Sequence, residues 1–268
     1  MTRLYPLSPT KAGVWLDCRY RFFLQYVGRV PRRGSWAHLT MGNAIHAVLR
    51  DAFDVPADAR TSERVTAMMA SQWSDEGFHD AEQSRQWRDR AAAMTERYLG
   101  ALDPQFEPRS REQNLGARTE AITITGRIDR LDERTDGSVV VVDYKTGRSV
   151  PDEDEARSSM ALAAYALCVR QSLRRPCHVV ELHHIPTGSV ASWEHTDATL
   201  ARHLERIDRV GREMAAAEAE WTAGAADVSA LFPASPGPLC GWCDYRVECV
   251  EGQRAAEPRD PWAGLPTD

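Results

Sequence analysis

The sequence contains no long hydrophobic run, and this absence limits the classes of protein to which the chain can belong. None of its apolar stretches approaches the roughly 20 residues that a membrane-spanning helix requires. Its first residues, MTRLYPLSPTKAG, contain no apolar signal-peptide segment. We therefore expect a cytoplasmic protein without membrane contact. With 268 residues, of which 43% are hydrophobic, the chain can form one large globular domain with a packed core.

A net positive charge is missing as well. The formal net charge is −6, which by itself does not favour a protein that binds nucleic acid. The charge balance excludes little, however, because a local basic groove is sufficient for such binding, and a metal site gathers acidic side chains. Arginines are clustered near the N-terminus and again between residues 85 and 90. Each of them can equally be a solvated side chain on a helix surface.

Helical and strand-like patterns alternate along the chain and predict an α/β fold. Apolar residues recur at helical spacing over residues 8–27, 41–53, 61–73, 81–102, 158–173 and 197–220. β-Branched residues accumulate over residues 119–133, 138–148 and 177–185, which we expect to be strands. Together these segments predict a mixed central sheet flanked by helices.

We expect this fold to form a single domain over residues 1–250. Its expected parts are a helical region (1–110), a catalytic core (111–220) and a cysteine-rich closing segment (239–250). Residues 251–268, rich in proline and charge, are expected to form a disordered tail.

The hairpin between residues 119 and 148 carries three charged residues that can converge. Residues two apart in a strand share a face, so Asp143 and Lys145 project together. A three-residue loop at Thr135-Asp136-Gly137 sets Asp129 directly opposite Asp143, whereas a two-residue turn puts them on opposite faces. We predict the three-residue loop, because Gly137 then occupies the left-handed position that this loop class prefers.

Two carboxylates on one face repel each other unless a cation lies between them. Mg²⁺ and Mn²⁺ prefer oxygen ligands, and such an ion can activate a water molecule and neutralise charge on a phosphate group. Lys145 could orient or deprotonate that water, or stabilise the developing negative charge. The alternative is that Asp129, Asp143 and Lys145 are strand-end surface charges that form ordinary ion pairs.

The segments GRIDR and VVVVDYKTG resemble the core of the PD-(D/E)XK nuclease superfamily, in its RecB-like exonuclease branch. The resemblance implies a restriction-endonuclease-like core in which Asp129 and Asp143 bind Mg²⁺ or Mn²⁺ and Lys145 is catalytic. It implies a third ligand, His46, since MGNAIHAVL matches the family's helical histidine motif. It also implies a ligand in the backbone carbonyl of Tyr144. A histidine satisfied by the core or by solvent is the alternative for His46.

Two further residues fit the family pattern less completely. The family places a Q-x-x-x-Y motif on the helix after the second acidic strand, and Tyr165 falls at the tyrosine position. Ala161 stands where the glutamine should be. The resemblance implies that Tyr165 positions DNA for catalysis, and core packing is the alternative. Glu112 is either a family acidic residue near the site or a surface glutamate.

Six cysteines in a chain that is expected to stay in the cytoplasm do not indicate a disulfide framework. A metal site and buried thiols are the better explanations. Cys168 and Cys177 belong to no ligand pattern, so we expect them to be buried thiols.

The other four cysteines have the spacing of a metal site. Cys240, Cys243 and Cys249 form a C-x-x-C-x₅-C pattern, and Cys18 is the candidate for a fourth ligand. The number of thiolates does not separate zinc from an iron–sulfur cluster, and unrelated thiols remain a third explanation. The pattern is similar to that of AddB nuclease subunits and CRISPR-associated single-domain nucleases. This resemblance implies a [4Fe-4S] cluster that joins the two ends of the chain.

The function implied by the resemblance is that of a Mg²⁺- or Mn²⁺-dependent deoxyribonuclease. More specifically, it implies an exonuclease on single-stranded DNA or DNA ends, in DNA repair or CRISPR adaptation. Any helicase or CRISPR-adaptation protein would be a partner, because the sequence contains no helicase motif. The alternative is a catalytically inactive DNA-binding or assembly module with the same fold. The missing glutamine supports this alternative, and the intact Asp129, Asp143 and Lys145 oppose it.

Overall fold

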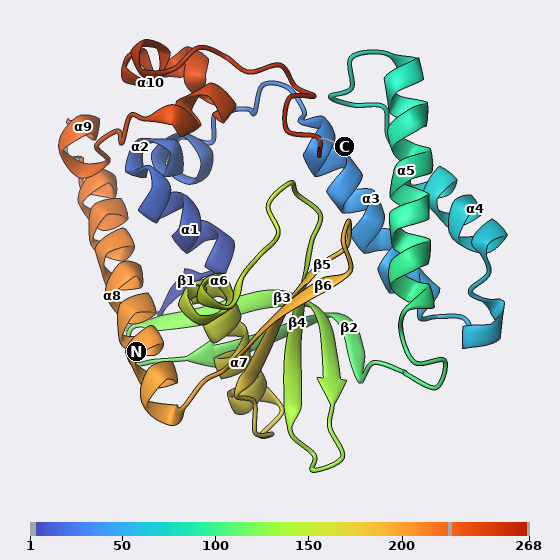
Figure 1. The fold of residues 1–268 in the computed structure, drawn as a ribbon. Helices are drawn as coiled ribbons and strands as arrows, with labels where there is room; N and C mark the ends of the chain where they lie inside the picture. Colours follow the sequence, from blue (N-terminus) through green and yellow to red (C-terminus); the bar gives the residue numbers. More distant parts are fainter. Residues whose placement is uncertain (1–3, 225–226, 267–268) are drawn as a thin grey trace.

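A central sheet lies between layers of helices in the computed structural model, which describes residues 4–224 and 227–266 (Figure 1). Its six strands are β1 (Tyr5–Leu7), β2 (Ser110–Arg118), β3 (Ile122–Glu133), β4 (Val139–Lys145), β5 (Val179–His184) and β6 (Ser189–Glu194). Strands β2 and β4 pair with β3 antiparallel, whereas β1 pairs with it in parallel. Strand β5 is parallel to β4, and β6 is antiparallel to β5. The predicted mixed sheet is confirmed.

Ten α-helices surround this sheet in the described part of the chain. They are α1 (Pro9–Asp17), α2 (Arg19–Phe22), α3 (Ala37–Ala52), α4 (Ser62–Gln72), α5 (Ala81–Gly100), α6 (Glu153–Ser158), α7 (Met160–Ser172), α8 (Asp197–Thr222), α9 (Val228–Leu231) and α10 (Val250–Ala255). Helices α3, α4 and α5 lie to one side, and α1, α7 and α8 pack on the other (Figure 1). Within the described ranges, none of the helices is both long and apolar enough to cross a membrane.

Strand β4 separates two hydrophobic cores. Val139 and Val141 pack with α7 and α8, whereas Val140 and Val142 pack with α3 and α5. All four valines are at most 4% exposed. A strand that is covered on both faces is apolar throughout, which explains why this run of valines does not alternate with polar residues.

The β3–β4 hairpin has the predicted register. Arg130 lies opposite Val142, and the Arg134 N–H donates to the Ser138 carbonyl oxygen at 2.9 Å. Residues 135–137 are thus the three-residue loop, with Gly137 at a φ of +79°. The same register, continued by one pair, sets Asp129 opposite Asp143.

Several segments differ from the expectation. The predicted helix over residues 8–27 is interrupted at Cys18, whose extended backbone ends α1 and caps α2. Strands β1, β2 and β6 were not expected, because they are short or rich in polar residues and are partly exposed.

The expected disordered tail is another difference, over residues 251–266. It begins in α10, and Leu265 is only 5% exposed in the core that contains α3. The Ala37 N–H donates to the Pro261 carbonyl oxygen at 3.0 Å. Trp262 and Leu265 thus give this polar segment two apolar anchors, and residues 267–268 lie outside the described residues. The domain limits remain a prediction.

Candidate metal centre

Three neighbouring strands each carry one carboxylate in the same row across the sheet. In β2 and β3, Arg111 pairs with Arg130 and Gln113 with Ile128, which sets Glu112 opposite Asp129. The hairpin register sets Asp143 next to Asp129 on the other side. Glu112 and Asp129 open into a cleft of about 510 Å³ that His46, Tyr144 and Lys145 also line. The row places acidic side chains of β2, β3 and β4 at one location.

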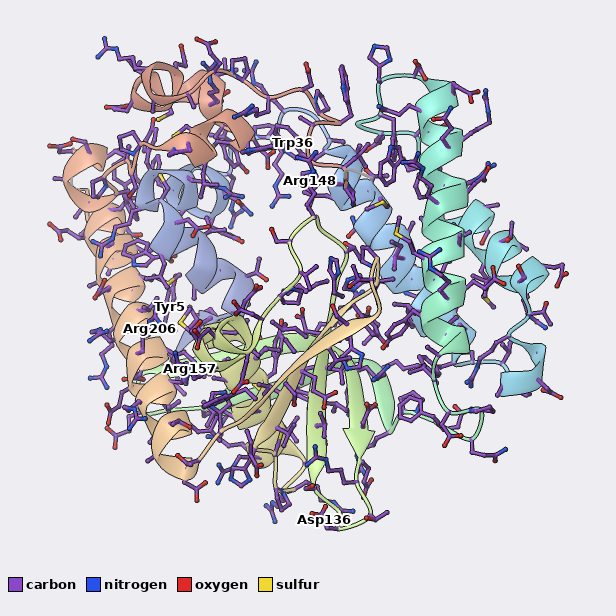
Figure 2. All side chains as sticks on the ribbon, in the orientation of Figure 1. Tyr5, Trp36, Asp136, Arg148, Arg157 and Arg206 are labelled. Atoms are coloured by element: carbon purple, nitrogen blue, oxygen red, sulfur yellow. The ribbon has the colours of Figure 1, made fainter. Side chains whose placement is uncertain are left out.

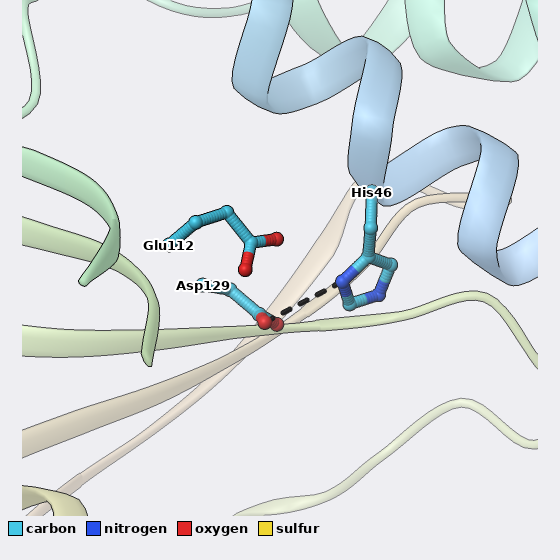
Figure 3. A group of neighbouring side chains, drawn as sticks. All are labelled: His46, Glu112 and Asp129. Atoms are coloured by element: carbon cyan, nitrogen blue, oxygen red, sulfur yellow. Dashed lines mark ion pairs between the residues drawn. The ribbon is translucent and has the colours of Figure 1, made fainter. Parts of the chain in front are cut away.

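Helix α3 brings His46 to this row. The His46 Nδ1 atom lies 3.4 Å from Asp129 Oδ1 (Figure 3). Gly42, one helical turn earlier, explains how α3 comes so close, because a Cβ atom there would lie 2.9 Å from Thr146 Oγ1 at the end of β4. The glycine of the histidine motif therefore permits the close packing that positions the histidine.

One atom each from His46, Glu112 and Asp129 lies within 4.8 Å of the others (Figure 3). Nitrogen and carboxylate oxygens at this spacing could hold a divalent cation, and the oxygens suit Mg²⁺ or Mn²⁺. Asp129 also accepts a hydrogen bond from the Tyr144 backbone N–H at its Oδ2 atom, at 2.9 Å. This bond fixes the carboxylate so that Oδ1 points to His46.

Glu112 reaches the group through an unusual backbone conformation. Its φ is +46°, in the left-handed region, which costs a non-glycine residue about 1–2 kcal/mol. An ion pair with Arg127 holds its side chain. Sequence reasoning left Glu112 open as a surface residue, and the structure places it beside His46 and Asp129. The sequence carries no signal for the left-handed backbone.

Asp143 and Lys145 share a face, as predicted, and their Oδ2 and Nζ atoms lie 2.9 Å apart. Burial raises the pKa of Asp143, and the charge of Asp129 raises it further, against the opposing effect of Lys145. Burial lowers the pKa of Lys145, but the charge of Asp143 outweighs it and the net pKa is raised. The pair is therefore a carboxylate that is costly to ionise and an ammonium that is stabilised.

Burial and neighbouring charges also have opposite effects on the pKa of His46. Burial lowers its pKa, but the hydrogen bond with Asp129 and the charges of Asp129, Asp143 and Glu112 make the net shift upward. A bound cation would replace the proton as the positive partner of these carboxylates. The carboxylates of Glu112, Asp129 and Asp143 thus favour a positive charge beside them, whether it is a protonated His46 ring or a bound cation.

Tyr165 stands on α7 with its ring against Gly126 of β3, where a side chain larger than hydrogen would clash. Burial raises the pKa of its hydroxyl, and the charges of Asp143 and Asp129 add to this, so Tyr165 lies within electrostatic reach of the site. This position is compatible with both sequence-based interpretations, and its role stays a prediction.

The four predicted cysteine ligands come together at a second location. Cys18, Cys240, Cys243 and Cys249 all line one cavity of about 150 Å³, together with residues of α2 and α10. Backbone N–H groups approach three of the sulfur atoms, at 3.2 Å for Gly252 to Cys249, 3.4 Å for Gly237 to Cys240 and 3.5 Å for Ser235 to Cys18. Such contacts stabilise a thiolate.

The chain matches a family model over most of its length. A family model described as the PD-(D/E)XK nuclease superfamily matches residues 6–250. No curated protein sequence matches the chain. A crystal structure from Eubacterium rectale, provisionally assigned as an exonuclease, is 12% identical, with a TM-score of 0.47 over 78% of this chain and 82% of that one. The structure of a protein named SSO0001 is 14% identical, with a TM-score of 0.37 over 93% and 88%.

Both TM-scores are below 0.5, so neither likeness supports a conclusion about this chain. The family match, in contrast, spans α3, the acidic hairpin and the cysteine segment. The resemblance of GRIDR and VVVVDYKTG to this superfamily is thus confirmed at the level of the superfamily. This chain belongs to the PD-(D/E)XK nuclease superfamily.

Proposed function

We propose that this protein is a Mg²⁺- or Mn²⁺-dependent deoxyribonuclease, specifically an exonuclease of the RecB-like branch that acts on single-stranded DNA or DNA ends. The observation that carries the proposal is the convergence of His46, Glu112 and Asp129 beside the Asp143–Lys145 pair, in a cleft open to a substrate. A nuclease of this superfamily needs both a cation site and room for a phosphodiester next to it.

The metal would be held by His46, Asp129 and Asp143, with the backbone carbonyl of Tyr144 and, from its position, Glu112 as further ligands. When bound, the ion supplies a Lewis acid and a water molecule of lowered pKa. The donor set fits such an ion, because carboxylate oxygens predominate and repel one another without it.

Lys145 would orient or deprotonate the water, or act on the phosphate. Against the effect of burial, the charge of Asp143 raises its pKa, which favours the protonated form. A protonated ammonium can donate hydrogen bonds to a phosphate oxygen and stabilise the charge that develops in the transition state. Asp143, 2.9 Å away, holds the ammonium in place.

The cleft also offers groups for the rest of a DNA strand. Arg50 and Arg127 line it with Asn43 and His38, and these side chains can contact phosphates or bases. Tyr165, on the opposite helix layer, would position the strand beside the metal. The preference for single strands and for ends rests on the family resemblance.

We further propose that Cys18, Cys240, Cys243 and Cys249 bind a [4Fe-4S] cluster with a structural role. Four thiolates around zinc at about 2.3 Å would lie about 3.8 Å from one another. Within the described ranges, no three of these sulfur atoms lie within 4.8 Å of one another, so they are not spaced as zinc ligands. The choice of a [4Fe-4S] cluster rests on the family resemblance. The cluster would join the segment between α1 and α2 to the C-terminal segment and so restrict the unfolded chain.

From the family resemblance we infer a role in DNA repair or CRISPR adaptation. The expectation that the protein works in the cytoplasm comes from the sequence and stays part of this proposal. A helicase or CRISPR-adaptation protein would be a partner that delivers single strands.

The decisive experiment is cleavage of end-labelled single-stranded DNA by protein purified without oxygen, with Mn²⁺ or Mg²⁺. Cleavage should disappear with a chelator and in Asp143→Ala. The matched control is Glu96→Ala, an exposed carboxylate on α5 outside the cleft, which should cleave normally. A folded, metal-supplied protein that binds DNA without cleaving it would instead be the inactive binding module, for which Ala161 is the one indication.

A further inference from the structure

A third cavity lies between α6, β6 and the first turns of α8. Its volume is about 530 Å³, and we call it the α8 pocket. Arg157 of α6 and Arg206 of α8 mark its two walls (Figure 2). The residues that carry the argument are Arg157, Trp193, His195, Arg202, His203 and Arg206.

The α8 pocket has an excess of positive charge. None of the residues that line it is a carboxylate. Arg202 and Arg206 are exposed, and within residues 4–224 and 227–266 neither forms an ion pair. They are four residues apart on α8 and so point to the same side of the helix. Arg157 pairs with Asp154, at 2.8 Å. Two arginines therefore face this pocket without a counter-charge, which favours an anionic ligand.

Two buried polar atoms at the pocket lack partners. His195 is only 2% exposed, and its Nε2 atom has no hydrogen-bond partner, although its Nδ1 lies 3.2 Å from Thr199 Oγ1. The Nε1 atom of Trp193 is also buried without a partner. An indole N–H can only donate, and an imidazole nitrogen donates in the appropriate protonation state. Unsatisfied buried groups of this kind are rare, and a ligand with acceptor oxygens would satisfy them.

The pocket lies on the sheet face that also carries Asp143. Trp193 pairs with Val180 of β5, which pairs with Val141 of β4, two residues before Asp143. Residues two apart in a strand share a face. Strand β6 is separated from β4 by two strand spacings of about 4.8 Å each. Helices α7 and α8 cover the face itself, but α6 follows β4 in the chain and carries Arg157, which lines the pocket. A polymeric substrate at the metal centre would therefore reach the α8 pocket over α6.

We propose that the α8 pocket binds a phosphate group of the DNA strand whose scissile bond lies at the metal centre, with Arg202 and Arg206 as the charged contacts. The proposal rests on the proposed nuclease function. It gives the enzyme an anchor outside the metal centre, and binding energy from such a remote contact orients the strand for reaction. A substrate that is too short to reach the pocket gains no binding energy from this contact.

The test compares two substrates in Mn²⁺. One is a single-stranded oligonucleotide, in 5′-phosphorylated and 5′-hydroxyl forms, and the other is bis(p-nitrophenyl) phosphate, which fills only the metal centre. The pocket variant is Arg202→Gln with Arg206→Gln. The control is Arg64→Gln with Arg209→Gln, which removes two exposed arginines outside the pocket.

The pocket variant should show a KM for the oligonucleotide about tenfold higher, with little change in the hydrolysis of the small ester. The slope of log KM against log salt should fall by about 0.7, the contribution of one single-strand phosphate contact. Equal losses for the two oligonucleotides would support an internal phosphate, and a loss confined to the 5′-phosphorylated form would support a terminal one. A KM equal to that of the control variant would overturn the proposal.

Failure of the nuclease function is distinguishable from failure of the pocket. If the wild-type protein hydrolyses neither substrate, the proposed nuclease function is wrong. The pocket is then tested by comparing the affinities of the pocket variant and the control variant for labelled single-stranded DNA. Weaker binding by the pocket variant than by the control would still support a DNA phosphate in the α8 pocket. Equal binding would contradict it.

Discussion

The backbone N–H of Tyr144 donates to the Asp129 Oδ2 atom at 2.9 Å, across the end of the β3–β4 hairpin. Regular pairing of the two strands ends one residue earlier, at Arg130 and Val142. The carboxylate thus takes the place of a backbone acceptor, and its position is tied to the backbone of the following strand. This bond orients the carboxylate of Asp129, a proposed metal ligand. Its donor is Tyr144, whose backbone carbonyl is proposed as a further ligand.

Asp129→Asn should abolish hydrolysis without weakening the fold. The amide removes a charged metal ligand, and we expect activity to fall by about 100-fold or more. The variant also relieves repulsion among Asp129, Asp143 and Glu112, so in a chelator its melting temperature should equal or exceed that of the wild type. Thermal unfolding with EDTA, beside the cleavage assay, checks both. A less stable but active variant would show that Asp129 has a structural role instead.

Gly42→Ala should impair cleavage although alanine favours helices. The added Cβ atom would lie 2.9 Å from Thr146 Oγ1, so α3 must move and carry His46 away from Asp129. Combining it with Thr146→Ala should restore part of the activity, because the clashing oxygen is then absent.

Gly13→Ala is the matched control for this glycine. A Cβ atom at Gly13, in α1, meets no atom within 4 Å, so the variant should gain about 0.5–1 kcal/mol in unfolding free energy and cleave normally. Denaturant titrations and cleavage rates of the variants are the measurements. Equal activity of Gly42→Ala and Gly13→Ala would mean that the close approach of α3 is unimportant.

The cysteines should divide into two groups by reactivity. Cys168 and Cys177 are fully buried, and burial raises the pKa of both thiols to about 12. They should resist iodoacetamide at pH 8 while the protein is folded. In metal-free protein Cys18 and Cys240, which are partly exposed, should react, and loading with iron and sulfide should protect them. Mass spectrometry of the alkylated peptides tests this, and reaction of Cys18 in a loaded protein would exclude it as a ligand.

His195 should make the protein sensitive to acid. Burial and the charges of His203 and His178 lower the pKa of His195 to about 4, below its ordinary value of 6.5. The native state therefore disfavours the charged ring, so the stability that His195 contributes is present above pH 6.5 and is lost as the pH falls toward 4. Unfolding free energy should decline less over this interval in His195→Asn. An identical decline in both proteins would contradict the assignment.

The parts of the site that the sequence predicts are those governed by local rules. Gly137 fixes the loop type, the loop fixes the register, and the register brings Asp129 opposite Asp143. The position of Glu112 at the site could not be predicted from such rules. Strand β2 is polar and its pairing depends on β3, and the left-handed backbone of Glu112 departs from the usual strand conformation. Tertiary contacts, rather than local pattern, place it at the site.

The C-terminal segment illustrates the same limit. Residues 256–266 have the composition of a disordered tail, yet Leu265 is buried against α3. Two apolar side chains are sufficient to anchor a short segment where a complementary surface exists, and that surface is formed by residues far away in the sequence. Composition alone does not reveal it.

The central claim is that a divalent cation is surrounded by His46, Glu112, Asp129 and Asp143. The most direct test measures Mn²⁺ binding by electron paramagnetic resonance at increasing metal concentration. The wild-type protein should bind Mn²⁺ at this centre, and Asp129→Asn and Asp143→Ala should each weaken binding by at least about tenfold. The Glu96→Ala control should bind like the wild type. Mn²⁺ affinity that is unchanged in both site variants would contradict a metal centre at this row of carboxylates.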